Sequence, residues 1–582
     1  MSRRAAWRGA VLLVVGVLAL AGCSGVPTSS SPQAVKSIGF GGVVNPVPGP
    51  PKGAGPRDIV KTFLGANWAE PTTLDSARQF LTPTARKTWN PTSKTTVIAS
   101  NPSIGTFTDK GTVTVLARAL GTLNADGAYT PSFGETVKFT YGLDNSVGGQ
   151  YRINLPPPGL VVTEDLFNRY YSARPIYFYD AADAYLVPFV RYSALSDQNQ
   201  LANWLMNQLA NPPEPQNVVS AESLPAQAHR LTVTLGALTK IQIPGSRQLD
   251  GPARNRLAAQ VSQTLAGGPS AVGVTRGSLS IVDGTAPISV RAAHGTVFSA
   301  STFTAALGPT GPAVPEVNYL VGGRVTDQTG KPLAGAINAG RYSYTSVALA
   351  RRGSGGAFAA AAVVGTGDRQ QLLVGTVQGG LRPTAVPRGA LSRPAWAPGL
   401  GEVWIGDGAQ VFRVTTGGRS PAVKQVATPS AAGGGRIVAL RLSPDGARIA
   451  LVVSGSHRSG QIYIGSVVRG AGDPQVVNLQ PISPDGVVIT DVAWNYALRL
   501  TAIGYLAASG EPRVFEVGVD GAEWDERGIS GLPAAPISLT AATGAPAWVS
   551  ADGFVWTQNG STSWISPGPT GQTPGTNPVY LS

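Results

Sequence analysis

The C-terminal half of the sequence repeats a pattern of short apolar segments, and this repeat restricts the possible folds more than any other feature. Each unit is marked by one apolar or aromatic residue, at Leu349, Trp396, Leu442, Trp494 and Trp548. Successive marker residues lie 46 to 54 residues apart. The four-stranded blades of a β-propeller repeat with a similar period. The spacing therefore predicts a β-propeller domain over residues 317–582.

Turn sequences within the repeat support the same fold. Ser443-Pro444-Asp445-Gly446 and Ser550-Ala551-Asp552-Gly553 each stand just before an apolar segment, as expected of a hairpin turn that leads into a buried strand. Five units are visible, and we expect residues 317–320 and 579–581 to build a sixth blade that closes the ring. Two β-sandwiches with accidental spacing are the alternative.

Residues 57–183 predict an α+β domain, because a helical period gives way to an alternating one. Apolar residues recur at helical spacing from Ile59 to Leu64, after Pro56, and again from Leu74 to Leu81. A third short helix is expected over 166–171. The predicted strands are 112–116, 136–141, 150–153 and 176–179.

Residues 184–285 predict a second, smaller α+β domain with the order β-α-β-β-α-β-β. One helix carries Leu201 and Trp204 and ends at Asn211-Pro212-Pro213, and the other begins at Asp250. The predicted strands are 186–190, 231–235, 240–243, 272–275 and 279–282. Residues 286–316 are interpreted as a connector to the propeller.

The first residues carry the features of an export signal, predicted over 1–22. Arg3, Arg4 and Arg8 precede an apolar run at 10–21, which is too short to cross a bilayer. Leu20-Ala21-Gly22-Cys23 follows and resembles the lipobox of bacterial lipoproteins. This resemblance implies cleavage between Gly22 and Cys23, and a Cys23 that carries an S-diacylglycerol and an N-acyl group such as palmitate. The alternative is an ordinary signal peptide whose thiol stays unmodified.

The residues that follow, 23–56, are rich in Ser, Gly and Pro and are predicted to form a flexible linker. Cys23 is the only cysteine of the chain. Once it is acylated, no disulfide, thiolate ligand or cysteine nucleophile is left. The domains must then be stabilised by packing alone.

The chain is basic, with a formal net charge of +13 that falls to +10 when the three arginines of the signal are removed. Anionic headgroups or acidic wall polymers suit such a charge on an exported protein. No dense Lys/Arg cluster is present, so a weakly basic solvated surface is the simpler interpretation. We expect no nucleic-acid partner.

The sequence lacks the motifs of common enzyme classes. It contains no H-E-x-x-H, G-x-S-x-G or P-loop motif, and His229, His294 and His457 lie far apart. We therefore predict no catalytic residue, metal or cofactor. The acidic residues of the Asp-Gly turns are interpreted as turn residues, because one carboxylate per loop is too few for calcium; they are Asp445, Asp485 and Asp552.

The tryptophans of the repeat have two interpretations. They lie at positions of alternating period, where packing in the core is the usual role, and lining a carbohydrate groove is the alternative. These residues are Trp396, Trp404, Trp494, Trp548 and Trp556.

The order of the predicted modules resembles the actinobacterial lipoprotein family LpqB, over essentially the whole chain. The middle block resembles a GerMN domain in Leu186-Val187-Pro188, in Trp204-Leu205 before the two prolines, and in the stretch 257–265. Residues 150–156 (QYRINLP) also resemble the family. The resemblance implies an N-terminal α+β domain, a GerMN-like α+β domain and a C-terminal β-propeller.

The resemblance also implies a function. The family member would be a lipoprotein on the extracytoplasmic face of the cell membrane that binds the extracytoplasmic domain of the sensor kinase MtrB. It would tune the MtrA–MtrB two-component system in cell-wall and division control, without enzymatic activity. The alternative is a lipoprotein that binds peptidoglycan or acidic glycopolymer. A propeller hydrolase is a third hypothesis, for which the sequence offers no nucleophile–base pair.

Replacement of Cys23 tests the anchor. Cys23→Ser should abolish both fatty-acid labelling and removal of the signal, because serine has no thiol to acylate. Metabolic labelling with a fatty-acid probe and the electrophoretic mobility of the chain measure the two effects. Normal labelling of the serine variant would refute the lipobox interpretation.

Overall fold

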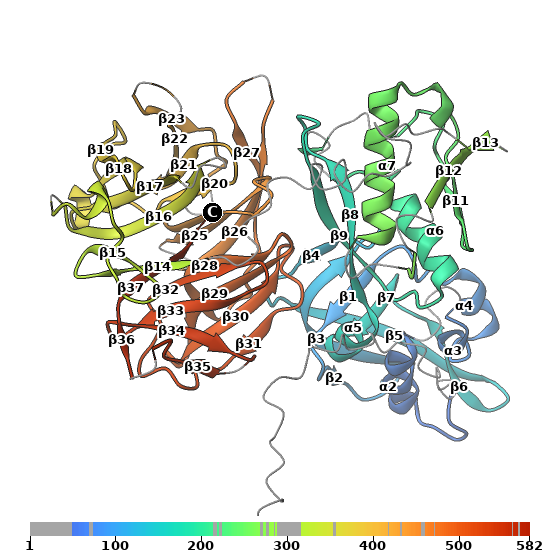
Figure 1. Ribbon diagram of the computed structural model, residues 1–582. Coiled ribbons are helices and arrows are strands. Elements are labelled where there is room, and N and C mark those ends of the chain that lie inside the picture. The colour runs from blue at the N-terminus through green and yellow to red at the C-terminus, as the bar shows by residue number, and fades with distance from the viewer. Residues whose placement is uncertain are drawn as a thin grey trace, which may run out of the picture. The chain divides into compact units, whose positions relative to one another are not determined.

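The computed structural model has helices in the first half of the chain and strands throughout (Figure 1). Val47–Ser582 forms one compact unit. The residues described are 49–582, except 69–73, 214–217, 220–223, 268–271, 275–278, 285, 288–315, 341, 353–356, 417, 419, 431–433, 456–459, 471, 562, 569–570 and 582. Gly22, Cys23, His294 and His457 lie outside the described residues, and so does most of the predicted connector. Acylation of Cys23 therefore stays a prediction.

The N-terminal module combines short helices with one sheet in the order β6-β5-β3-β1-β7. Its helices are α2 (Pro56–Ala66), α3 (Asp75–Arg78), α4 (Pro83–Thr88) and α5 (Glu164–Tyr170). Its strands are β1 (Thr95–Ile98), β2 (Ser103–Ile104), β3 (Thr112–Leu123), β4 (Tyr129–Pro131), β5 (Thr136–Val147), β6 (Gln150–Leu155) and β7 (Leu160–Thr163). The predicted α+β class is confirmed.

Helix α2 begins at Pro56, whose fixed φ suits the first helical position. The second predicted helix is wrong in length, because α3 is a single turn. Pro83 begins a separate helix, α4, after the Thr82 side chain accepts a hydrogen bond from the Ala85 amide. Between the two helices Leu81 leaves the helical path and forms a bridge with Ile153 of β6. The apolar residues from Leu74 to Leu81 are buried as their spacing indicates, but they lie in a single helical turn and the bend after it, not in one continuous helix.

The second module contains the hairpin β8 (Ser172–Tyr179) and β9 (Leu186–Ser193) and a sheet β10-β11-β12-β13. Its helices are α6 (Gln198–Gln208) and α7 (Gly251–Ala266). The sheet strands are β10 (Thr232–Thr234), β11 (Thr239–Gln242), β12 (Leu279–Asp283) and β13 (Ala286–Pro287). The side chain of Asp250 caps α7 by accepting from the Ala253 amide.

Two details of the second module differ from the sequence prediction. Val272 is buried, but 272–274 form no strand. The hairpin β8–β9 crosses the predicted boundary between residues 183 and 184, and Ile176 and Phe178 of β8 pack with α6 and α7 in one apolar cluster. A strand at the end of one predicted block thus pairs with the first strand of the next.

The propeller consists of six sheets among the described residues, and five of them are built from consecutive strands. We call these blades 1 to 5; their strands are β16–β19, β20–β23, β24–β27, β28–β31 and β32–β36. The bounds are β16 (Tyr344–Arg352), β17 (Ala357–Val364), β18 (Gln371–Thr376), β19 (Gly380–Pro383), β20 (Ala395–Ala397), β21 (Glu402–Asp407), β22 (Gln410–Thr415), β23 (Ala422–Val426), β24 (Arg436–Leu442), β25 (Arg448–Ser454), β26 (Gln461–Val468), β27 (Gln475–Pro481), β28 (Val487–Tyr496), β29 (Arg499–Leu506), β30 (Pro512–Gly518), β31 (Asp525–Arg527), β32 (Ser538–Ala542), β33 (Ala545–Ala551), β34 (Phe554–Asn559), β35 (Ser563–Ile565) and β36 (Thr573–Pro574).

Blade 6 closes the ring with strands from both ends of the propeller. Strand β14 (Val317–Val321) pairs with β15 (Arg324–Asp327) on one side and with β37 (Thr576–Tyr580) on the other. Val317 lies opposite Tyr580, and Asn318 lies opposite Val579. The predicted pairing is confirmed, and so is the propeller fold. The inner strands β16, β20, β24, β28, β32 and β37 contact one another in turn around the axis.

Blade 6 has three strands, and a side chain takes over part of the role of a fourth. Asn338 lies at the end of η5 (Ala336–Asn338), and its side-chain oxygen accepts a hydrogen bond from the backbone amide of Val325 at 3.0 Å. Its nitrogen donates to the Val325 carbonyl at 2.8 Å and to the Leu333 carbonyl at 2.9 Å. The backbone amide and carbonyl of Val325 in β15 are thereby hydrogen-bonded without another strand.

The repeat predicts the wrong strand for one marker residue, Trp548. Leu349, Trp396, Leu442 and Trp494 lie on inner strands, but Trp548 lies on β33, the second strand of blade 5. Blade 5 begins at β32 with Ser538. Both strands carry short apolar segments of period two, so the pattern alone cannot tell the first from the second.

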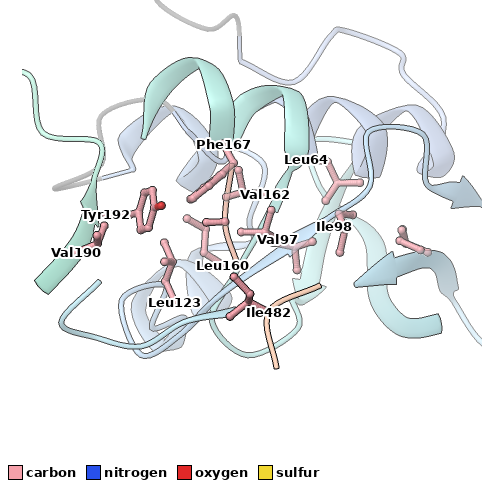
Figure 2. Packing of buried hydrophobic residues seen from close by; sticks show 14 of the residues in the cluster. Leu64, Val97, Ile98, Leu123, Leu160, Val162, Phe167, Val190, Tyr192 and Ile482 are labelled. Atoms are coloured by element: carbon pink, nitrogen blue, oxygen red, sulfur yellow. The ribbon is translucent and has the colours of Figure 1, made fainter. Parts of the chain in front are cut away.

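The buried apolar core of the N-terminal module continues into the propeller. A single cluster of buried side chains includes residues of both, and Ile482, just after β27, is one of them. Figure 2 shows Ile482 in this cluster together with Leu123 of β3 and Leu160 of β7. Gly521 packs against the same region, since an added Cβ there would lie 2.9 Å from the Ile482 carbonyl oxygen.

Asp520 is a partly buried acid next to this cluster, in the turn between β30 and β31. Its Oδ1 accepts from the Ala522 amide at 3.1 Å, and its Oδ2 is shielded from water. Burial, and then repulsion from Glu523, raise the pKa of the Asp520 carboxyl to about 6. A carboxyl whose pKa is raised by folding disfavours the folded state once it ionises.

Asp520→Asn should remove this pH dependence. The wild-type chain should lose on the order of 2–3 kcal/mol of unfolding free energy from this group as the pH rises from 4 through 6 to 7.5. The amide variant should lack that loss, because it has no proton to release. Urea unfolding at several pH values measures the difference. Asp552→Asn, in an exposed turn, is the matched control, and an equal response of both variants would contradict the assignment.

Candidate binding site at the propeller axis

A cluster of charged side chains lies where the inner strands meet, and we call Arg393, Arg441 and Asp491 the axial cluster. Arg393 precedes β20, Arg441 lies on β24 and Asp491 on β28. The Arg393 Nη1 lies 2.9 Å from the Asp491 Oδ2, and the Arg441 Nη2 lies 2.9 Å from the Asp491 Oδ1. One carboxylate therefore binds two guanidinium groups that come from two other blades.

The axial cluster reaches two further blades through backbone groups. Arg393 donates to the Leu539 carbonyl of β32 at 3.0 Å and to the Pro578 carbonyl of β37 at 2.7 Å. The Leu539 amide donates to the Asp491 Oδ2 at 2.9 Å. Five of the six inner strands are thus linked through three side chains. Blade 1 joins the ring separately, where the Val347 amide donates to the Asn577 Oδ1 at 3.3 Å.

The axial cluster is positive and shielded from water. The Asp491 side chain is 3% exposed and each arginine side chain is 15% exposed. Burial, and then the like charge of Arg441, lower the pKa of the Arg393 guanidinium to about 10. Two cations share one anion, so the cluster has a surplus positive charge in surroundings where charges interact strongly.

A cavity of about 1410 Å³ opens beside the axial cluster. It lies at the end of the axis where the inner strands run into the turns that lead to the second strands. Arg393 and Arg441 line it together with Trp396, Trp494 and Tyr496. Further lining comes from the β8–β9 hairpin, at Ala173, Pro175, Tyr177, Pro188, Val190 and Tyr192. We call this cavity the axial pocket.

Arg448 fixes the β8–β9 hairpin beside the pocket. This buried side chain of β25 donates to the Pro188 carbonyl and lies over the Phe189 ring, 4.8 Å from its centroid. Its guanidinium is also 3.5 Å from the Asp445 carboxylate. Burial lowers the pKa of Arg448, and Asp445 opposes that change. The hairpin is therefore held by a buried cation and a ring contact.

The five tryptophans singled out in the sequence are buried, which confirms the core interpretation. Trp396 and Trp494 line the pocket but are each 4% exposed. The Trp396 indole donates to the Ala348 carbonyl at 3.1 Å, and the Trp494 indole donates to the Arg441 carbonyl at 3.3 Å. Each indole thus bonds to the inner strand of the preceding blade, and its face is not open for stacking on a sugar ring.

The aspartate turns behave as predicted. The Ala447 amide donates to the Asp445 Oδ1 at 3.0 Å, and the Ser443 hydroxyl donates to the same oxygen. Asp552 has a positive φ of 52°, which Asp tolerates in a turn. In the described part of the chain, His229 is exposed and no group of three or more His, Cys, Asp or Glu side chains could hold a metal ion. No described helix is both long and apolar enough to cross a membrane.

The axial cluster was not predicted from the sequence. Arg393 and Arg441 are 48 residues apart, and Asp491 follows 50 residues later, with no motif around any of them. The one feature of the sequence that could have indicated the cluster is a charged residue inside an apolar strand, such as Arg441 between Leu440 and Leu442. Such a residue must find a partner when the strand is buried.

Comparisons with known proteins place the chain in a family. The family model of the LpqB N-terminal domain matches residues 49–168, and that of the LpqB β-propeller domain matches residues 320–580. Lipoprotein LpqB of Mycolicibacterium smegmatis is 30% identical over an alignment of 474 residues, which covers 76% of this chain and 78% of that protein. The chain belongs to the LpqB lipoprotein family.

Other relatives cover more of the chain. Lipoprotein LpqB of Rhodococcus jostii is 28% identical over an alignment of 565 residues, which covers 92% of this chain and 90% of that protein. Among solved structures, TolB from Acinetobacter baumannii is 12% identical, with a TM-score of 0.30 over 48% of this chain and 70% of its own. That score is too low to carry an argument, and the propeller assignment rests on the strand pairing and the family model.

Removal of the shared carboxylate tests the role of the axial cluster. Asp491→Ala should lower the unfolding free energy by about 3–5 kcal/mol, because it leaves two guanidinium groups that are largely shielded from water without a counter-charge. Asp473→Ala is the control: that side chain is 51% exposed and pairs with Arg413 and Lys424, so its loss should leave the unfolding free energy nearly unchanged. Chemical unfolding measures both, and similar losses would show that the cluster is not structural.

Proposed function

We propose that this LpqB-family lipoprotein is a non-enzymatic accessory factor on the extracytoplasmic face of the cell membrane. Cys23 carries its lipid anchor, and the folded modules bind the extracytoplasmic domain of the sensor kinase MtrB. Through that contact the lipoprotein modulates MtrA–MtrB signalling in cell-wall and division control. The family assignment supports the lipoprotein part of the proposal.

The observation that carries the binding role is the character of the axial pocket. At about 1410 Å³ it is larger than the usual pocket for a small ligand, which measures roughly 300–1,000 Å³. Its described lining contains no histidine, cysteine, serine or lysine, and its two carboxylates, Asp445 and Glu523, are paired with Arg448 and Arg499. The groups most often used as nucleophiles or bases are therefore either missing from this lining or held in ion pairs. A wide, largely apolar pocket with a few charged groups favours a protein segment as the ligand.

The tether supports a membrane protein as the partner. The predicted linker separates Cys23 from α2, which begins at Pro56, so the folded modules would stay within a short distance of the bilayer. A partner in the same membrane would then meet a high effective concentration of the lipoprotein. A kinase with an extracytoplasmic domain satisfies this requirement.

Capture from membranes tests the proposal. The acylated chain, extracted in a non-ionic detergent, should enrich the purified extracytoplasmic domain of MtrB over the level seen with an unrelated lipoprotein of similar charge. Equal recovery with both lipoproteins would refute the kinase as partner. Sedimentation with purified cell walls over a salt series tests the alternative ligand, because binding to an acidic polymer should weaken as salt screens the charges.

A further inference from the structure

We infer that the axial pocket recognises an acidic side chain on an extended peptide segment, with the axial cluster as the group that attracts the carboxylate. The inference rests on the proposed function in one respect, namely that the segment belongs to the protein partner. The pocket itself is defined by residues of this chain alone. Its charge, its lining and its exposed aromatic residue each bear on the chemistry of the ligand.

Charge pairing leaves the positive surplus at the axial cluster. Elsewhere in the lining, cations have carboxylates of their own: Arg351 lies 3.6 Å from Glu316, and Arg499 contacts both Glu516 and Glu523. Asp445 of the lining is likewise matched by Arg448. Only Arg393 and Arg441, among these lining residues, share a single carboxylate. An anion that enters the pocket therefore gains most beside this pair.

A donor of the axial cluster also lacks a partner. The Arg393 Nε is buried and has no hydrogen-bond partner among the described residues. A buried donor of a charged group that stays unsatisfied costs free energy. A carboxylate near the cluster would offset part of that cost through its charge. Carboxylate groups match guanidinium groups in geometry as well as in charge.

The lining favours a peptide over a polysaccharide. The two tryptophans of the pocket have their faces covered, as described above, so the usual stacking platform for sugars is missing. The exposed aromatic residue is Tyr496, which is 53% exposed at the end of β28. Pro394, Pro398 and Pro444 contribute rigid apolar surface with no amide hydrogen to satisfy. A lining of this kind suits an extended peptide that places one charged side chain beside the axial cluster.

The test uses the full chain in detergent and a fluorescent hexaglutamate peptide as the probe, with hexaglutamine as the neutral comparison. Fluorescence anisotropy should show that hexaglutamate binds the wild-type chain and hexaglutamine does not. Arg441→Gln removes the surplus charge and leaves a one-to-one pair of Arg393 with Asp491. This variant should weaken hexaglutamate binding about tenfold or more.

Two further variants keep the test independent of folding. Tyr496→Ala changes an exposed side chain at the pocket and should weaken the binding several-fold even if Arg441→Gln unfolds. Arg382→Gln removes an exposed charge of β19 outside the pocket and should leave the affinity unchanged. No binding of hexaglutamate to the wild-type chain, or an equal loss in all three variants, would overturn the inference.

The same variants separate this inference from the proposed function. If hexaglutamate binds in the expected pattern but the MtrB domain is not captured, the pocket assignment stands and the kinase is not the partner. If the MtrB domain is captured equally well by the wild-type and the Tyr496→Ala chains, and hexaglutamate is not bound, the partner is right and the pocket assignment is wrong.

Discussion

The Asp491 carboxylate is the interaction on which the propeller ring most depends. It lies near the axis and takes one guanidinium from the blade 2 side and one from blade 3, while Leu539 of blade 5 donates its amide. Neighbouring blades are also joined by apolar contacts and by single hydrogen bonds such as those of the Trp396 and Trp494 indoles. The axial cluster links blades that are not neighbours, so it restrains the ring as a whole. Removing one member of such a buried network costs far more than removing an exposed pair.

Local signals explain why much of the fold was predictable. Asp445-Gly446 and Asp552-Gly553 fix turns by their own backbone preferences, and the following strands read as buried segments. The closure by β14 and β37 followed from the need to complete a ring with the residues left over. The predicted start of blade 5 at Trp548 is wrong, because the inner strand and the second strand of a blade have the same alternating pattern. Whether Leu81 belongs to a helix or to a bridge with Ile153 likewise depends on tertiary pairing.

The candidate site could not be predicted, because its residues come together only in the closed ring. Arg393, Arg441 and Asp491 lie on three blades, and each is an isolated charge in an apolar context. Within one strand, a charge of this kind cannot be told from a solvent-facing residue. Whether such a charged residue binds a partner depends on the position of its strand at the propeller axis, and the local sequence does not indicate that position. Cys23 is the opposite case, since its predicted chemistry depends only on the residues beside it.

The two arginines of the axial cluster are not equivalent, and this difference indicates which of them is available to a ligand. Arg393 bonds to Asp491 and to two carbonyl groups of other blades, so its role in closing the ring accounts for it. The Arg441 side chain makes one hydrogen bond across blades, to Asp491, and its other hydrogen bond goes to the carbonyl of its own neighbour Leu440. A single arginine would neutralise Asp491. The second adds a charge that is only 15% exposed and that the ring does not need for neutrality, and such a charge is costly unless an anion approaches it. Arg441 is therefore the residue whose presence is better explained by a ligand than by the fold.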